Sequence, residues 1–319
     1  MAAVRARPNL RLSIPTETNT CPRFSFPVPL TTSLSIINTP QTIQQLSDLD
    51  VLEVLGQGNS GTVYRVIHKV TSDFYALKII RSDCDPIIRR QSLREIEILR
   101  CTRSPYIVQC DGVFEKACGD IAIALELMDA GSLDYLLKTN GSFTEKLLSK
   151  IAGQVLKGLN YLHAQKIVHR DIKPANILVN KKMEVKIADF GCSRIMCRML
   201  DTCDTFIGTR AYMSPERYDP SAYGGNYNGY AGDVWSLGLT IAELFLGYYP
   251  LLPPGENPDW ITLMCAICSG EPLSLPETST SPEFRDFIGC CLHKDFSKRW
   301  TVSQLLSHPF VSQSQDLAS

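Results

Sequence analysis

The chain has 319 residues and a mass of 35.5 kDa, which allows one large domain or two medium ones with a substantial hydrophobic core. Hydrophobic residues make up 44% and charged residues 20% of it, which excludes collagen-like, fibrous and wholly disordered proteins. With 32 basic and 33 acidic residues the net charge is −1, so the whole chain has no electrostatic reason to bind nucleic acid or an acidic membrane.

From the sequence we expect neither a membrane-spanning helix, nor a secretory signal, nor N-myristoylation. No apolar stretch approaches the roughly 20 residues that a membrane-spanning helix needs, and the best one, from Leu237 to Leu252, is interrupted by Glu243. The first residues lack the apolar core of a secretory signal, and Ala2 stands where N-myristoylation requires glycine. We expect a cytoplasmic protein, with the nucleus open as a second location.

The 12 cysteines are spread through strand-like and helix-like segments, so we expect reduced thiols rather than a disulfide framework. Two close pairs, Cys265 with Cys268 and Cys290 with Cys291, could be interpreted as zinc ligands. Their apolar helical context and the lack of a histidine at ligand spacing favour core packing instead.

Residues 1–46 differ in composition from the rest of the chain. Six prolines interrupt any helix there, and Ser, Thr and Asn fill the gaps, which predicts a flexible arm. Four arginines against the single acidic residue Glu17 make this arm basic. We expect the folded domain to span residues 47–310 and a short polar tail to span 311–319.

The folded part opens with β-rich segments and continues with helical ones. Strands are predicted at residues 51–55, 62–67 and 74–80, a charged helix at 87–101, and two further strands at 107–114 and 121–126. Apolar residues at 148, 151, 155, 159 and 162 form one helix face, and helical patterns recur at 231–247, 259–269, 282–292 and 301–307. The prediction is an α+β protein with a β-rich lobe (47–128) before a larger helical lobe (129–310).

A glycine-rich segment lies between the first two predicted strands and reads Gly56-Gln57-Gly58-Asn59-Ser60-Gly61-Thr62-Val63. By itself this pattern is compatible with a dinucleotide fingerprint, a phosphate-binding hairpin or a tight turn. A dinucleotide site requires a helix after the glycines, whereas the residues after Gly61 predict a strand. Glycines allow backbone N–H groups to approach phosphates, because no Cβ stands in the way.

Lys78 lies inside the apolar strand predicted at 74–80. A lysine there must bury its stem and needs a charge partner, unless it lies on an edge strand and extends to solvent. We expect Glu95 on the next helix to be the partner, with Glu97 as a competitor on a different helix face.

The most informative segment is His169-Arg170-Asp171-Ile172-Lys173-Pro174-Ala175-Asn176-Ile177-Leu178, followed by Asp189-Phe190-Gly191. Its polar residues offer a base, a cation and two oxygen ligands, a set that suits phosphoryl transfer. Asp171 can accept a hydroxyl proton, and Asn176 and Asp189 can hold Mg²⁺. Lys78 and Lys173 can neutralise phosphate charge.

With Ser214-Pro215-Glu216, Asp233 and Arg299, these motifs resemble the signature set of the protein kinases, in the same order, over about residues 49–310. The resemblance implies a bilobal fold with ATP and Mg²⁺ in its cleft, a Glu216–Arg299 ion pair, and Asp233 bracing the catalytic loop. The catalytic residues implied are Lys78, Glu95, Asp171, Lys173 and Asn176. The implied ATP-binding residues are Leu55, Gly56, Gln57, Gly58, Asn59, Ser60, Gly61, Val63, Ala76, Lys78, Leu125 as gatekeeper, and Glu126 and Met128 through their backbone.

Several segments are similar to one kinase family, the MAP kinase kinases: residues 127–133, 189–194 and 208–217. Residues 217–219 and 230–239 resemble the plant enzymes, and the short C-terminal tail resembles the short plant forms without a transport-factor-like extension. Lys173 is typical of a serine/threonine-type catalytic loop. The resemblance implies a dual-specificity kinase that phosphorylates Thr and Tyr in the T-x-Y activation loop of a MAP kinase.

The arm carries a sequence that resembles a MAP kinase docking motif, in which basic residues precede two alternate hydrophobic ones. Arg5, Arg7, Leu10 and Leu12 match that pattern. Cations can meet an acidic patch while alternate leucines of an extended peptide fill pockets. The alternative is a basic leader with no partner.

Activation is where the sequence departs from the family. The plant enzymes are activated by an upstream kinase at two Ser/Thr positions before a Gly-Thr, here Gly208-Thr209. The second position is Thr205, but the first is Met199, and Thr202 lies off register. We take Thr205, Thr209 and Arg170 as regulatory, with Arg170 receiving the phosphate. Alternatives are a weakly active or scaffold-like homologue, and a serine/threonine kinase with another substrate.

Overall fold

The computed structural model describes residues 43–58, 61–83, 85–195, 210–223, 228–255 and 258–312. Several predicted site residues lie outside these ranges: Arg5, Arg7, Leu10, Leu12, Asn59, Ser60, Met199, Thr202, Thr205 and Thr209.

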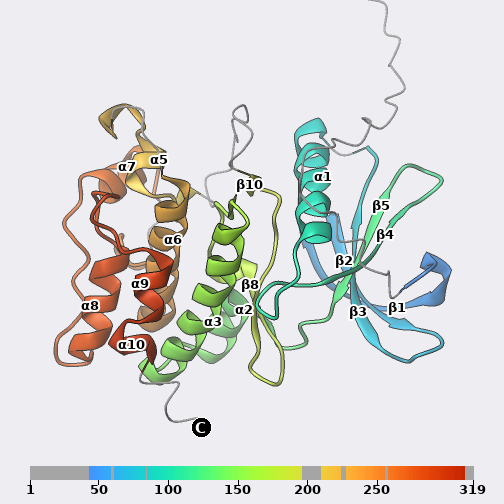
Figure 1. The fold of residues 1–319 in the computed structure, drawn as a ribbon, viewed down its shortest axis with the longest axis horizontal. Coiled ribbons are helices and arrows are strands. Elements are labelled where there is room, and N and C mark those ends of the chain that lie inside the picture. The colour runs from blue at the N-terminus through green and yellow to red at the C-terminus, as the bar shows by residue number, and fades with distance from the viewer. Residues whose placement is uncertain are drawn as a thin grey trace, which may run out of the picture. The chain divides into compact units, whose positions relative to one another are not determined.

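The first lobe is built on a five-stranded antiparallel sheet whose strands follow the order β1-β2-β3-β5-β4 (Figure 1). Its strands are β1 (Leu49–Gly58), β2 (Gly61–His68), β3 (Phe74–Ile80), β4 (Cys110–Glu115) and β5 (Ile121–Glu126), with a 3-10 turn, η1 (Leu46–Asp48), before β1. Helix α1 (Pro86–Cys101) begins at Asp85, whose carboxylate accepts the Ile87 N–H at 2.7 Å, with Pro86 in the first turn.

The second lobe is mainly helical, and its helices gather around α3 and α6 (Figure 1). The helices are α2 (Leu133–Asn140), α3 (Glu145–Ala164), α5 (Pro215–Tyr218), α6 (Gly229–Leu246), α7 (Trp260–Cys268), α8 (Pro282–Cys291), α9 (Val302–Leu306) and α10 (Pro309–Ser312). Short strands and 3-10 turns lie before and between these helices: β6 (Gly131–Ser132), β7 (Ile167–Val168), η2 (Pro174–Asn176), β8 (Ile177–Val179), β9 (Val185–Ile187), β10 (Arg194–Ile195) and η3 (Ser221–Tyr223).

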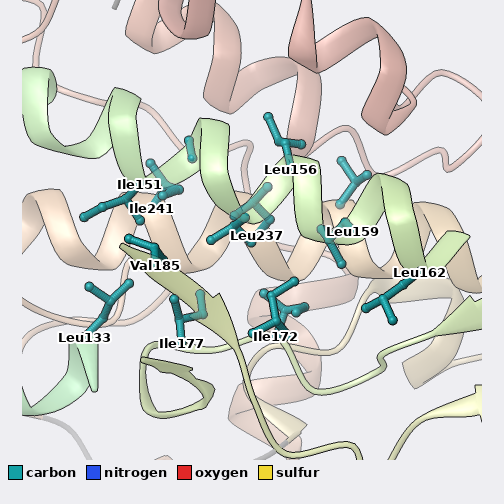
Figure 2. Close-up of a cluster of buried hydrophobic side chains, with 14 of the residues drawn as sticks. Leu133, Ile151, Leu156, Leu159, Leu162, Ile172, Ile177, Val185, Leu237 and Ile241 are labelled. Carbon is teal, nitrogen blue, oxygen red and sulfur yellow. The ribbon is translucent and has the colours of Figure 1, made fainter. Parts of the chain in front are cut away.

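The apolar face of α3 forms the centre of this lobe. Figure 2 shows Ile151 and Leu159 of α3 facing Leu237 of α6 and Val185 of β9, all of them buried. Burial of each such side chain stabilises the fold by about 1.5–3 kcal/mol. β8 and β9 pack in the same core as α3 and α6. The loop that precedes β8 and the loop that follows β9 are therefore held on a rigid support.

The α+β prediction, with a β-rich lobe before a helical one, is confirmed. The structure corrects both ends of the predicted folded part, because Ile43 and Val311 are fully buried although they were assigned to the arm and the tail. Ile43 packs with the sheet core, and Val311 lies against Gly153 of α3. Ile43 stands between polar neighbours and leaves no periodic signal, whereas Val311 directly follows Phe310, so that boundary was missed by a single residue.

Within the described part of the chain, no helix combines the length and apolarity required to cross a bilayer.

Candidate active site

The glycine-rich segment forms the tip of the β1–β2 hairpin, where Gly58 pairs with Gly61 and Gly56 pairs with Val63. A strand follows the glycines, which rules out the dinucleotide fingerprint. Gly61 has φ of +131°, and a Cβ there would lie 2.1 Å from the carbonyl oxygen of Ile79, so this position requires glycine. A Cβ at Gly56 or Gly58 would meet nothing within 4 Å, so their backbone is open to a ligand.

Lys78 lies on the central strand of the sheet, because β3 pairs with β2 through Val63 and with β5 through Ile123. The edge-strand alternative for this lysine is therefore wrong. Its Nζ donates to Glu95 Oε2 at 2.6 Å, and the two residues are only 7% and 3% exposed. Burial lowers the pKa of Lys78, but the attraction of Glu95 and Asp189 outweighs it and raises the pKa overall, which keeps the lysine charged. Glu97, the competitor, is exposed.

The connection between the lobes follows β5. Leu125 pairs with Ala76 of β3, and Glu126 pairs with Tyr75, so Leu125 stands at the end of the sheet beside the position of Lys78. Met128 is buried, and its carbonyl accepts the Gly131 N–H at 3.1 Å, which forms a tight turn. Ala76 and Leu125 are thus neighbours at the point where β5 leads into the 126–128 backbone, while Leu55 is half exposed on β1.

Asp171 is oriented by two neighbours in its own loop. Its Oδ2 accepts hydrogen bonds from Lys173 Nζ at 2.9 Å and from Asn176 Nδ2 at 2.8 Å. Its Oδ1 is buried and has no hydrogen-bond partner among the residues that the structure describes. Burial raises the pKa of Asp171 despite the nearby charge of Lys173. An oriented carboxylate with one free oxygen and a raised pKa suits a general base.

Asp233 of α6 fixes the backbone that carries Asp171. Its fully buried carboxylate accepts the N–H groups of His169 at 2.9 Å and Arg170 at 2.8 Å. His163 of α3, which the sequence reasoning missed, adds a third contact at 2.9 Å through Nε2. Burial alone would raise the pKa of Asp233, but these hydrogen bonds lower the pKa overall and keep the carboxylate ionised. Arg170 takes a left-handed φ of 70°, a strained conformation that this network holds.

Asp189 follows β9 and also has a left-handed conformation, with φ of 63°. The next residue, Phe190, is fully buried and packs edge-on against His169 with ring centroids 5.1 Å apart. Burial raises the pKa of Asp189, but the charge of Lys78 and the Gly191 N–H, 3.2 Å from Oδ1, lower it more. Asp189 therefore remains an ionised ligand beside Lys78.

These residues fit a nucleotide phosphate chain with a divalent metal ion. The Nδ2 of Asn176 donates to the backbone oxygen of Asp171 at 2.9 Å as well as to its carboxylate, which leaves the amide oxygen of Asn176 as a ligand. With the Asp189 carboxylate it provides the hard oxygen donors that such cations prefer. Lys78 and Lys173 supply positive charge for the phosphates.

The segment that precedes α5 forms hydrogen bonds with α6 and with a residue that follows α6. The hydroxyl of Tyr212 donates to Glu243 at 2.6 Å, and Ser236 Oγ donates to the Tyr212 carbonyl oxygen at 2.7 Å. The hydroxyl of Tyr249 donates to the Ala211 carbonyl oxygen at 2.6 Å. The sequence reasoning missed these contacts, since a tyrosine or serine in a sequence carries no signal of a distant partner.

Glu216 and Arg299 form the ion pair that the resemblance implied. The guanidinium binds both carboxylate oxygens, at 2.9 and 3.1 Å, and both side chains are completely buried. Arg299 also stacks over the ring of Trp235 at 5.1 Å and donates to the Ala231 carbonyl oxygen. The pair joins α5, α6 and the loop before α9 into one unit.

Two nitrogen atoms of the Arg170 guanidinium are buried beside the catalytic loop. These atoms, Nε and Nη1, have no hydrogen-bond partner in the described ranges. Arg217 lies beside Arg170 and donates from Nη1 to its backbone oxygen at 2.5 Å. Two buried, charged donors of this kind suit the binding of an anion.

Comparison with known proteins agrees with this geometry. Residues 49–311 match the family described as protein kinase domain. Mitogen-activated protein kinase kinase 9 of Arabidopsis thaliana is 54% identical over 316 residues, which cover 98% of this chain and 99% of that relative. Mitogen-activated protein kinase kinase 7 of the same plant is 53% identical over 317 residues, covering 98% and 100%. Mitogen-activated protein kinase kinase 1c of Physcomitrium patens is 42% identical over 282 residues, covering 86% and 80%.

Proposed function

The chain belongs to the MAP kinase kinase family of protein kinases, and from this premise we propose that it transfers the γ-phosphoryl group of ATP to Thr and Tyr in the T-x-Y activation loop of a MAP kinase. One observation carries the proposal most strongly. The site combines residues of both lobes: the charged pair of Lys78 and Glu95, the ionised Asp189 and the oriented Asp171. One Asp171 oxygen has no partner among the described residues and is available to a substrate.

The residues divide the chemistry between them. Asp171 Oδ1 accepts the proton of the substrate hydroxyl as the new O–P bond forms and the bond to the leaving ADP breaks. Lys173, which is bonded to Asp171, holds the carboxylate and faces the negative charge that spreads over the transferred group. Lys78, kept charged by Glu95, orients the phosphates.

Mg²⁺ is the metal ion that we propose for this site, bound by Asn176 and Asp189. When bound there by Asn176 and Asp189, it would supply positive charge that neutralises the phosphates. The hard oxygen donors favour it over softer metals. The glycines of the β1–β2 hairpin would cover the phosphates through their backbone N–H groups, since no side chain stands there.

For regulation we propose that an upstream MAP kinase kinase kinase phosphorylates Thr205 and that Arg170 receives this phosphate. The support is the pair of buried nitrogens of Arg170, Nε and Nη1, which lack partners among the described residues. A phosphate adds about −1.5 to −2 charges and can order a segment by meeting an arginine. Thr205 and Met199 lie outside the described residues, so sequence register alone places the phosphate.

For substrate capture we propose that the basic arm binds the MAP kinase through Arg5, Arg7, Leu10 and Leu12. The support is the pattern of two arginines and two alternate leucines. The scaffold-like alternative gains no support from the described residues, because the catalytic groups of both lobes are assembled.

A direct test measures phosphate transfer from ATP to a catalytically inactive MAP kinase, with the wild-type chain beside Lys78→Arg. The arginine keeps a positive charge but cannot reproduce the 2.6 Å contact of a lysine on the central strand, so activity should be nearly lost. Mapping the products should find both the Thr and the Tyr of the T-x-Y loop modified. Equal capture of the MAP kinase by both proteins, with no transfer by either, would favour the scaffold instead.

A further inference from the structure

A second charged pair, Lys186 with Glu126, lies where the two lobes meet. Lys186 of β9 donates to both carboxylate oxygens of Glu126, each at 2.7 Å. The Gln109 N–H also donates to Glu126 Oε1 at 2.7 Å, and the Glu126 N–H returns a bond to the Gln109 carbonyl oxygen at 3.0 Å. We call Gln109, Glu126 and Lys186 the interlobe clasp.

The clasp joins three segments that are far apart in the sequence. Glu126 ends β5, Gln109 follows the loop that comes from α1, and Lys186 lies on β9 of the helical lobe. Around it, Val108 N–H donates to the Ile187 carbonyl oxygen at 3.0 Å, and Ile187 N–H donates to the Tyr106 carbonyl oxygen at 2.9 Å. Segment 106–108 therefore forms a parallel bridge to β9, with the clasp at its side.

This location connects the clasp to both halves of the active site. The loop of Gln109 continues from α1, which carries Glu95, and β9 leads within three residues from Lys186 to Asp189. Any rotation of one lobe against the other at the connection would change the position of Asp189 relative to Lys78 and Glu95. A charged carboxylate that accepts three N–H bonds resists such a rotation better than neutral contacts do.

The burial of Lys186 argues that this is more than a surface ion pair. Its side chain is only 11% exposed and that of Glu126 is 26% exposed. The neighbouring pair Asp129–Lys181 also joins the connection to the β8–β9 hairpin, but it is 3.5 Å long and its lysine is 78% exposed. Exposed pairs of this kind contribute little, so Lys181 provides a matched control.

We propose that Glu126 and Lys186 are positioning residues for phosphoryl transfer, which hold Asp189 in register with the Lys78–Glu95 pair through the interlobe clasp. The clasp is closed in the same structure in which that pair is formed and Phe190 is buried, so it accompanies the assembled site rather than opposing it. The inference rests on the proposed function for its catalytic readout.

The experiment compares Lys186→Met, Glu126→Gln, their double variant, Lys186→Arg and the control Lys181→Met in the full chain. Three quantities are measured: kcat with the MAP kinase, KM for ATP, and amide hydrogen exchange at Val108 and Ile187. Thermal unfolding of each variant separates positioning from stability, because removing one partner of a buried ion pair can itself destabilise the fold.

For Lys186→Met we expect kcat to fall about tenfold, since small displacements of reacting groups are costly, while KM for ATP changes much less. Exchange at Val108 and Ile187 should accelerate about tenfold, as local opening becomes easier. Lys186→Arg should remain close to wild type in both. The double variant should be no worse than the more damaging single variant, because both changes open one clasp.

Three results would overturn the inference. These are wild-type kcat and exchange in Lys186→Met, an equal loss in Lys181→Met, or a higher activity of Lys186→Met before phosphorylation, which would make the clasp a brake. If Lys186→Met unfolds, Glu126→Gln decides in its place, since its amide oxygen still accepts the Gln109 N–H. If even the wild type fails to phosphorylate a MAP kinase, the proposed function fails, but unchanged exchange at Val108 and Ile187 still refutes the clasp.

Discussion

Replacing Asp171 by asparagine tests the assignment of the base with almost no change in shape. In the Asp171→Asn variant the new amide oxygen can take the place of Oδ2 and keep the bonds from Lys173 and Asn176, which are 2.9 and 2.8 Å long. The amide nitrogen then occupies the place of Oδ1, where it donates hydrogen bonds and cannot accept a proton. The variant thus removes the proton acceptor and leaves its supports.

The expected loss follows from that single change. Positioned general bases contribute a factor of about 10²–10⁴, so kcat should fall by that factor, equivalent to roughly 3–5 kcal/mol of barrier. Binding of ATP should change little, because Lys78, Glu95 and Asp189 are untouched. The assay is the initial rate of phosphate transfer to the MAP kinase at saturating ATP, with ATP affinity measured separately by calorimetry. Turnover within about threefold of wild type would refute the role of Asp171, since the smallest factor expected is about 10².

The pH profile gives an independent check of the same assignment. Only the ionised form of Asp171 can accept a proton, and burial raises its pKa above the ordinary value of 3.8. Activity should therefore be lost as pH falls through the raised pKa, at higher pH than an exposed aspartate would produce. Asp189, whose pKa is lowered, stays ionised throughout this range. Persistence of the same acidic limb in Asp171→Asn would assign it to another group.

Three further predictions concern stability, regulation and docking. Arg299→Met leaves the buried carboxylate of Glu216 without its partner and should lower the free energy of unfolding in urea by about 3–5 kcal/mol; a change under about 1 kcal/mol would contradict the buried pair. Thr205→Ala should depress activity towards the MAP kinase strongly after treatment with an upstream kinase, and full activity would refute single-site control. Replacing Leu10 and Leu12 by Ala should weaken capture of the MAP kinase yet leave transfer to a short peptide unchanged, whereas equal losses would point to a damaged fold.

The linear pattern of residues was sufficient for the main elements of this protein. β3 and β5 were predicted at their observed bounds, because apolar residues on central strands form continuous runs between turn signals. The apolar face of α3 was equally visible from its helical spacing. The two- and three-residue strands β6 to β10 were not predicted, because so few residues carry no period.

The local grouping of Asp171, Lys173 and Asn176 could also be read directly, since residues within one loop must lie close together. Pairing between residues of different helices and strands was a matter of tertiary structure. The sequence proposed Glu95 for Lys78 with Glu97 as a competitor, and only the orientation of α1 against the sheet brought Glu95 within 2.6 Å.

The remaining contacts of the site left no trace in the order of residues. Glu126 and Lys186 are 60 residues apart, and Asp233 meets His163 across 70. Each of these polar groups looks like an ordinary solvent-facing residue until the fold buries it, and then burial makes a partner necessary. Local propensity and hydrophobic period thus determined the helices and strands of this chain, while tertiary packing decided which charges meet, because that choice depends on distances that exist only in the folded protein.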